Sequence, residues 1–175
     1  QTMPSSVWQS SSGTTNIVCN YSREVIENDS VYYALPRREL FDKTGMLSAI
    51  FETDASGNFI GSSYLYASMR DYVRYGLLYL NKGNWLGEQI LPETWIDFTV
   101  TPADGSKGSY GAFFWLNKSK DYPDVPEDMY SCRGHDGQYI FIIPSKDLVV
   151  VRTGFSQKGV FDPNLFLKNI LDAIP

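Results

Sequence analysis

Residues 66–95 read YASMRDYVRYGLLYLNKGNWLGEQILPETW, and this stretch sets the organisation of the chain around it. Ser68 offers a hydroxyl at the start of a helical pattern, and Asp71 places a carboxylate three residues later. An apolar stripe at helical spacing follows, made of Tyr72, Val73, Tyr75, Leu77, Leu78 and Leu80. The polar tripeptide NKG ends the pattern, so we expect a helix over residues 68–80 and a second short helix from Pro92.

The residues before this stretch also predict helices with irregular connections. Apolar side chains at intervals of three and four predict a helix over residues 13–26, with Ser12 or Thr14 as its cap. A short helical turn follows between residues 35 and 45, with proline near its start and glycine at its end. We therefore expect residues 1–108 to form a mostly helical lobe.

After residue 108 the pattern changes to short runs of aromatic and β-branched residues. These runs predict strands over residues 110–116, 129–133, 139–143 and 148–153. The last segment, residues 164–174, predicts an amphipathic helix able to pack on one face of the sheet. The sequence thus predicts an α+β fold with two parts: a helical lobe over residues 1–108, and an antiparallel sheet with a packed C-terminal helix over residues 109–175.

Composition narrows the class of protein. The 175 residues are 43% hydrophobic and 20% charged, which is typical of a globular chain with a real core. Fifteen basic and twenty acidic residues give a net charge of −5, so the field of the protein repels phosphate backbones and nucleic acid is not an expected partner. No apolar run is long enough for a membrane span, and the first residues lack the pattern of an export signal.

The chain has few cysteines and histidines, the residue types that bind zinc. Cys19 and Cys132, with a single histidine, make no recognisable zinc pattern, and we expect neither a metal nor a cofactor. Two free thiols are the favoured state of the cysteines, and one disulfide between them is the alternative.

The strongest candidate for chemistry is the cluster Gly134-His135-Asp136-Gly137-Gln138 between two expected strands. His135 is the one histidine of the chain, so any imidazole chemistry must use it. Glycines around polar residues allow close backbone approach at a site. The same sequence also predicts a plain hairpin turn, because Asp-Gly is a strong turn signal, with His135 exposed beside it. Both interpretations stay open on local sequence.

Nucleophile motifs give no complete catalytic set. None of the serines is followed by lysine three residues later, and the chain holds neither a Gly-x-Ser-x-Gly elbow nor a Walker-type phosphate loop. A sugar or peptide groove is one interpretation of the tryptophans and tyrosines, but core packing explains them more simply.

Several segments taken together resemble the serine β-lactamase and penicillin-binding-protein superfamily, in the branch of class C β-lactamases, esterases and aminohexanoate-dimer hydrolases. WQSSSGTTN at residues 8–16 is similar to the segment that carries the second motif, Tyr-x-Asn or Tyr-Ser-Ser. LFDKTGM at residues 40–46 and the quoted stretch from residue 66 are similar to two further segments. YGAFFWL at residues 110–116 and GHDGQYIFIIPSKDLVVVRTG at residues 134–154 resemble the third motif and its hairpin.

The resemblance implies a β-lactamase/transpeptidase-like fold and an acyl-enzyme mechanism. A serine in Ser-x-x-Lys attacks the carbonyl, lysine and tyrosine move the proton, and backbone amides hold the oxyanion. By position, the resemblance implies that His135 and Ser10 are catalytic residues. His135 belongs to the third motif and orients the tyrosine network or the acidic end of the substrate, and the Gln138 N–H is an oxyanion donor. Ser10 occupies the place of the tyrosine, and the implied substrate-binding residues are Ser12, Asp136, Gly137 and Gln138.

Two departures from the family pattern qualify this reading. Ser-x-x-Lys precedes the tyrosine motif in the family and does not occur here, so we expect an N-terminally incomplete serine hydrolase, inactive as the isolated chain. Ser10 is a poor replacement for a tyrosinate, because a hydroxyl titrates far above tyrosine's pKa of about 10.

The expected substrate is a small amide, ester or β-lactam. Expected protein partners are a second copy of the chain or a missing N-terminal segment, since an incomplete sheet leaves apolar surface uncovered. The resemblance also implies a periplasmic or secreted protein. The alternatives are a non-catalytic binding or interaction module derived from the fold, and a structural fragment without a ligand.

Overall fold

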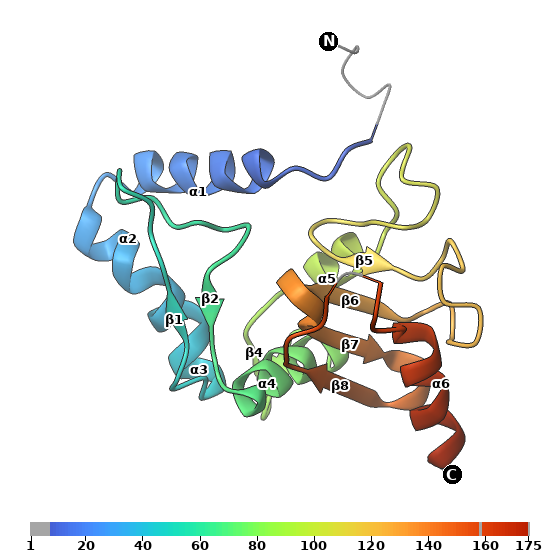
Figure 1. The fold of residues 1–175 in the computed structure, drawn as a ribbon. Helices are drawn as coiled ribbons and strands as arrows, with labels where there is room; N and C mark the ends of the chain where they lie inside the picture. The colour runs from blue at the N-terminus through green and yellow to red at the C-terminus, as the bar shows by residue number, and fades with distance from the viewer. Residues whose placement is uncertain (1–7, 158, 175) are drawn as a thin grey trace. The chain divides into compact units, whose positions relative to one another are not determined.

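The computed structural model describes residues 8–157 and 159–174. Contacts divide the described chain into two compact units, residues 9–75 and a second unit made of Trp8 and residues 76–174. Helix α4 (Met69–Leu80), drawn in green in Figure 1, runs across the division. The predicted boundary at residue 108 marks a change of element type and stays a prediction about domains.

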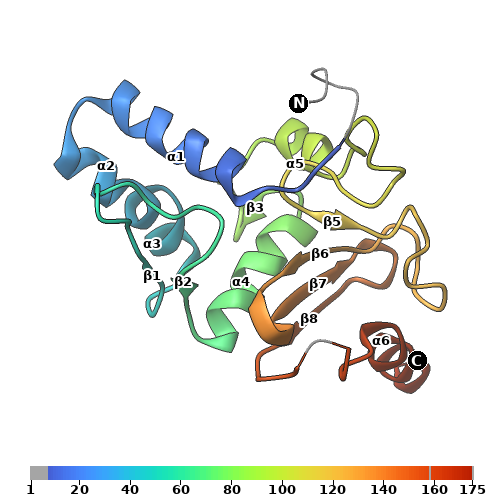
Figure 2. The same cartoon turned by 45° about the horizontal axis from the view of Figure 1, so that its top comes forward.

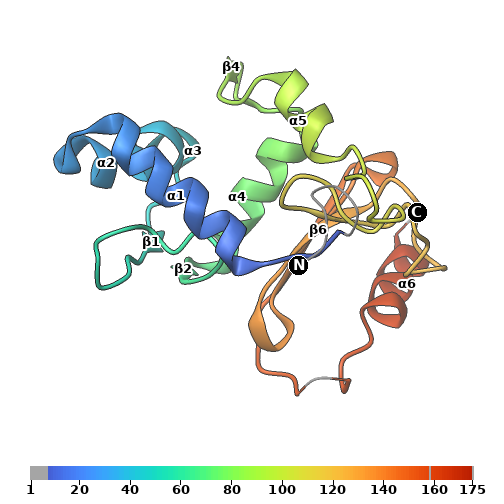
Figure 3. The ribbon, with the colours of Figure 1, turned by 90° about the horizontal axis from the view of Figure 1, so that it is seen from above.

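The first unit is mostly helical, as the sequence predicts. Its elements are α1 (Ser12–Ile26), α2 (Asp29–Pro36), the π-helical turn η1 (Arg37–Phe41), α3 (Asp42–Thr44), β1 (Ile50–Phe51) and β2 (Leu65–Tyr66), and Figure 3 shows α1 leading into α2. The prediction that Ser12 or Thr14 caps α1 is wrong. Ser11 is the extended residue before the helix, and its Oγ accepts the Gly13 N–H at 3.2 Å.

Asp71 fixes the start of α4 within this unit. The residue is 3% exposed, and its carboxylate accepts the backbone N–H and the Oγ–H of Ser48 at 2.9 and 2.6 Å. Arg74 Nη1 donates to the other carboxylate oxygen at 2.7 Å, and Ser68 Oγ accepts the Asp71 N–H at 3.3 Å. Asp71 is therefore a structural carboxylate, and the expected capping serine is in place.

The second unit contains a four-stranded antiparallel sheet in the order β5-β6-β7-β8. Its strands are β5 (Trp115–Leu116), β6 (Tyr130–Arg133), β7 (Tyr139–Ile143) and β8 (Leu148–Arg152). The turn η3 (Pro144–Lys146) joins β7 to β8, and α6 (Pro163–Ala173) ends the fold. Before the sheet come the hairpin β3 (Asn84–Trp85) and β4 (Glu88–Gln89), and then α5 (Glu93–Thr99).

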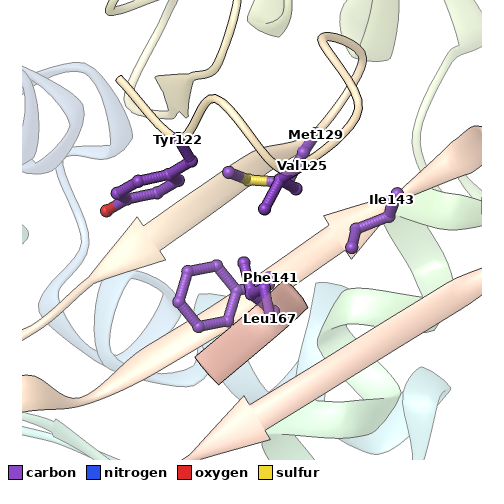
Figure 4. Close-up of a cluster of buried hydrophobic side chains, with 6 residues drawn as sticks. All are labelled: Tyr122, Val125, Met129, Phe141, Ile143 and Leu167. Atoms are coloured by element: carbon purple, nitrogen blue, oxygen red, sulfur yellow. The ribbon is translucent and has the colours of Figure 1, made fainter. Parts of the chain in front are cut away.

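Helices cover both faces of this sheet (Figure 2). On one face, a Cβ at Gly76 of α4 would lie 2.6 Å from Val149 Cγ1 and 3.1 Å from Ile140 Cγ2, so only glycine allows the helix so close. On the other face, Leu167 of α6 packs into the buried cluster of Figure 4. That cluster contains Tyr122, Val125, Met129, Phe141, Ile143 and Leu167.

The strand predicted over residues 110–116 is the largest difference from the sequence prediction. Only Trp115 and Leu116 form a strand, because Phe113 has a φ of +67° and the Gly111 N–H bonds to the Phe114 carbonyl at 2.9 Å, which makes a turn. The β3–β4 hairpin was not predicted. Its turn is formed by Leu86 and Gly87, with φ of +51° and +95°.

We expect the Asp71 carboxylate to make a pH-dependent contribution to the stability of the fold. Burial raises the pKa of Asp71, but hydrogen bonds from Ser48 and Arg74 outweigh it and hold the pKa below its ordinary value. This stabilisation is present above the unfolded pKa of about 3.9 and is lost as the pH falls through the lower folded pKa. We expect Asp71→Asn to lower the free energy of unfolding at pH 7 by about 1–3 kcal/mol.

Urea unfolding of both proteins between pH 7 and pH 2 tests this prediction. The difference between Asp71→Asn and wild type should shrink in the acidic range, while Asp104→Asn, at an exposed position, should match wild type throughout. A difference that is independent of pH would contradict the assignment of the stabilising group to the ionised carboxylate.

Candidate functional site

The predicted cluster forms the connection between β6 and β7, at the end of the sheet. The Gly134 N–H donates to the Gln138 carbonyl at 2.8 Å and closes the loop, and the turn η2 (His135–Gly137) lies inside it. Asp136 and Gly137 both have positive φ, +54° and +90°. Two successive residues in this region reverse the chain tightly, and a non-glycine residue there is strained. The hairpin interpretation of the cluster is therefore correct for the backbone.

A second segment, residues 152–156, holds this loop in place. Arg152 Nη1 donates to the Gly137 carbonyl and Nη2 donates to Ser156 Oγ at 2.5 Å. The Ser156 N–H donates to the Asp136 carbonyl at 2.9 Å. The Gln138 side-chain amide bonds to both backbone groups of Gly154, donating to its carbonyl at 2.5 Å and accepting its N–H at 3.0 Å. The strained turn is thus fixed from outside by several hydrogen bonds.

His135 projects from the loop into solvent. Its side chain is 94% exposed, and Nε2 lies 3.2 Å from Asp136 Oδ2. A hollow of about 270 Å³ lies beside the loop, with His135 and Asp136 on one side and Tyr139 and Phe161 as aromatic walls. The imidazole and the carboxylate can each hydrogen-bond a molecule that enters this hollow.

Ser10 and Ser12 lie in the other compact unit. Both are exposed; Ser12 is the first residue of α1, and Ser10 precedes the cap Ser11. The structure thus brings His135, Asp136, Gly137 and Gln138 together in one loop, and it places Ser10 and Ser12 at the start of one helix.

The cysteines are free thiols. Burial raises the pKa of Cys132 to about 12, so this thiol on β6 stays protonated at neutral pH and is a poor nucleophile. Within the described residues, no group of histidine, cysteine and carboxylate side chains is arranged to hold a metal ion. In the same residues, none of the helices combines the length and the apolarity that crossing a membrane requires.

Comparison with known proteins identifies the family. The Beta-lactamase family matches residues 10–165. The chain belongs to this family. Membership confirms the resemblance that the sequence suggested, and the helices and antiparallel sheet confirm the α+β prediction. No curated protein matches the chain.

Solved structures of the β-lactamase fold superpose on this chain. A protein from Bacillus anthracis assigned as a 6-aminohexanoate-dimer hydrolase has a TM-score of 0.74 at 23% identity, covering 100% of this chain and 47% of its own. A protein from Bacteroides dorei assigned as a β-lactamase has a TM-score of 0.62 at 14% identity, with coverages of 89% and 55%. At these identities the likeness establishes the fold. The chain spans about half the length of these two structures.

Arg152 is the site residue that sequence reasoning missed. On β8 it shares a face with Leu148 and Val150, which pack on the buried cluster, and its guanidinium lies 3.9 Å from the centre of the Phe161 ring. A charged residue at the end of the apolar run LVVV was the available signal, because a cation on a covered sheet face needs specific partners. Its partner, the Gly137 carbonyl, is a backbone atom that no sequence pattern marks.

A side chain at Gly137 would displace the Arg152 guanidinium from its place beside the loop. A Cβ there would lie 2.6 Å from Arg152 Nη1, whereas a Cβ at Gly87 meets nothing within 4 Å; the two glycines have φ of +90° and +95°. Both alanine variants suffer the same backbone strain, and only Gly137→Ala displaces Arg152. We expect Gly137→Ala to be less stable than Gly87→Ala by roughly 1–2 kcal/mol.

Chemical denaturation of the two variants beside wild type measures the difference. Equal losses at Gly87 and Gly137 would show that the contact between the loop and Arg152 does not constrain the backbone.

Proposed function

We propose that the 175 residues form the C-terminal part of a serine hydrolase that cleaves amide, ester or β-lactam bonds. One observation carries the proposal: a chain of the β-lactamase family presents His135 and the Gln138 peptide on a strained, externally fixed loop at the end of its sheet. Strain that surrounding residues maintain is a feature of functional sites.

The proposed reaction has two steps. A part of the protein outside these residues supplies the reacting serine and its lysine. The serine hydroxyl adds to the carbonyl carbon, and its proton passes to the lysine, which acts as the base. The tetrahedral oxyanion accepts a hydrogen bond from the Gln138 N–H; its collapse breaks the scissile bond, and the leaving group takes the proton. Water then hydrolyses the acyl ester by the same route and restores the serine.

The remaining site residues take supporting roles in this proposal. His135 and Asp136 hydrogen-bond the substrate beside the aromatic walls of the hollow, and Gly137 lines the same hollow. Ser10 stands where the family has a tyrosine, and its hydroxyl donates or accepts a hydrogen bond without becoming a base. Ser12, the first residue of α1, is a further substrate-binding residue in this proposal. We propose export to the periplasm or the medium, which fractionation of the source cells tests.

The isolated chain should not form an acyl-enzyme. We expect incubation with a fluorophosphonate probe to leave its intact mass unchanged, because no serine in the 175 residues has the Ser-x-x-Lys partner. Ser10→Ala serves as the control for weak background labelling. A stoichiometric mass increment on any serine of the wild-type chain would overturn the expectation.

Exposed apolar surface supports a protein partner. Ile17, Val18, Tyr21 and Val25 are 48–71% exposed and fall within about 100° of the α1 circumference. The opposite side of the helix carries its half-buried residues, which are Thr15, Cys19, Ser22, Arg23 and Ile26. A helix whose apolar side faces solvent is a binding surface. We propose that the rest of the hydrolase covers it, and that a second copy does so in its absence.

Association of the isolated chain is therefore expected. Sedimentation of the wild-type chain should show dimers or larger species, and the double variant Ile17→Lys/Val25→Lys should shift the distribution to monomer. Asn16→Lys, which adds a charge elsewhere on α1, is the control and should behave as wild type. A compact wild-type monomer at high concentration would argue against an uncovered interface.

A non-catalytic binding module is the second candidate function, favoured by serine at the tyrosine position. The gene sequence upstream of Gln1 discriminates the two. An open reading frame with Ser-x-x-Lys supports the hydrolase, whereas an unrelated domain supports the binding module.

A further inference from the structure

The charged side chain of Arg152 has neutral hydrogen-bond partners. It is half-buried at the end of β8, and among the described residues no carboxylate forms an ion pair with it. Its two donors reach the Gly137 carbonyl and Ser156 Oγ, and the guanidinium stacks on Phe161. A cation whose hydrogen-bond partners are neutral polarises the atoms that it contacts, because no bonded anion offsets its charge.

The Gly137 carbonyl and the Gln138 N–H belong to one peptide group. Resonance joins them, since electron density moves from nitrogen to oxygen and gives the C–N bond its double-bond character. A cation bonded to the oxygen draws more density from the nitrogen and makes the N–H a stronger donor. The contact of Arg152 with Gly137 therefore acts on the Gln138 N–H without touching it.

We propose that Arg152 is a positioning and polarising residue that strengthens the Gln138 N–H as an oxyanion donor. This inference rests on the proposed function, which assigns the donor role to that N–H. Arg152 does this in two ways. It fixes the direction of the peptide, because its bonds to Gly137 and Ser156 tie the loop to the end of β8, and it polarises the peptide through the carbonyl.

The strained backbone agrees with this role. Asp136 has a φ of +54°, which costs energy for a residue with a side chain, and a Cβ at Gly137 would displace the Arg152 guanidinium. A simple hairpin turn would not require hydrogen bonds from an arginine side chain to hold its backbone. Here the strain turns the Gly137 carbonyl toward Arg152, so that the N–H of the same peptide points the opposite way.

Three variants separate polarisation from simple support. Arg152→Met removes the charge but keeps an unbranched chain against Phe161. Arg152→Lys keeps a charged donor. Arg133→Met is the matched control, because Arg133 also lies at a strand end and stacks on aromatic rings, 4.6 Å from the centre of the Trp115 ring and 5.0 Å from that of Tyr122.

The first readout is the amide proton of Gln138 in NMR spectra of the 175-residue chain, and it needs no activity. We expect an upfield shift in Arg152→Met, a smaller one in Arg152→Lys and little change in Arg133→Met. A Gln138 amide that does not move in Arg152→Met would overturn the proposal.

The second readout is hydrolysis of p-nitrophenyl acetate by the full-length protein. Because the donor binds the oxyanion more tightly than the ground-state carbonyl, Arg152→Met should lower kcat about tenfold with KM nearly unchanged. Arg152→Lys should recover most of the loss. Unchanged kcat in Arg152→Met, or no recovery with lysine, would reduce Arg152 to a structural role and contradict the proposal.

The two readouts separate the two hypotheses. A full-length wild-type protein without esterase activity would count against the proposed function, while the amide shift would still decide whether Arg152 polarises the peptide.

Discussion

Strand β7 has to be covered on both of its faces, and the second compact unit is organised around that constraint. Phe141, Ile142 and Ile143 are completely buried, although successive side chains of a strand point to opposite sides. Gly76 lets α4 approach one face, and α6 closes the other through Leu167. A shift of one residue in the register of β7 would exchange the two faces, so packing fixes the register strongly.

The fixed register determines where the candidate site lies. Pairing of Arg133 with Tyr139 and of Tyr139 with Arg152 places the ends of β6, β7 and β8 together. The loop after β6 therefore meets the segment after β8, and Arg152 reaches the Gly137 carbonyl. The site loop owes its strained backbone to this meeting, since its hydrogen-bond partners come from a segment about fifteen residues away in sequence.

Local signals in the sequence predicted the elements well where pattern and packing agree. The run YIFII predicted β7 with its observed bounds, and the apolar stripe after Ser68 predicted α4. Both predictions succeeded because the spacing of apolar residues along a buried strand or an amphipathic helix follows which side chains are buried. The strand over residues 110–116 failed because Phe113 takes a positive φ that aromatic residues rarely adopt. The candidate loop was found from its glycines and its single histidine, whereas Arg152 was missed because its partner is a backbone carbonyl.

The central claim is that the Gln138 N–H faces the reacting carbonyl of a serine hydrolase, and a crystal structure of the full-length protein inhibited by a fluorophosphonate tests it most directly. We expect a phosphonyl group on the serine of a Ser-x-x-Lys motif, with its oxygen about 2.7–3.1 Å from the Gln138 nitrogen. An adduct whose oxygen is held by other donors, far from the loop of His135, would contradict it.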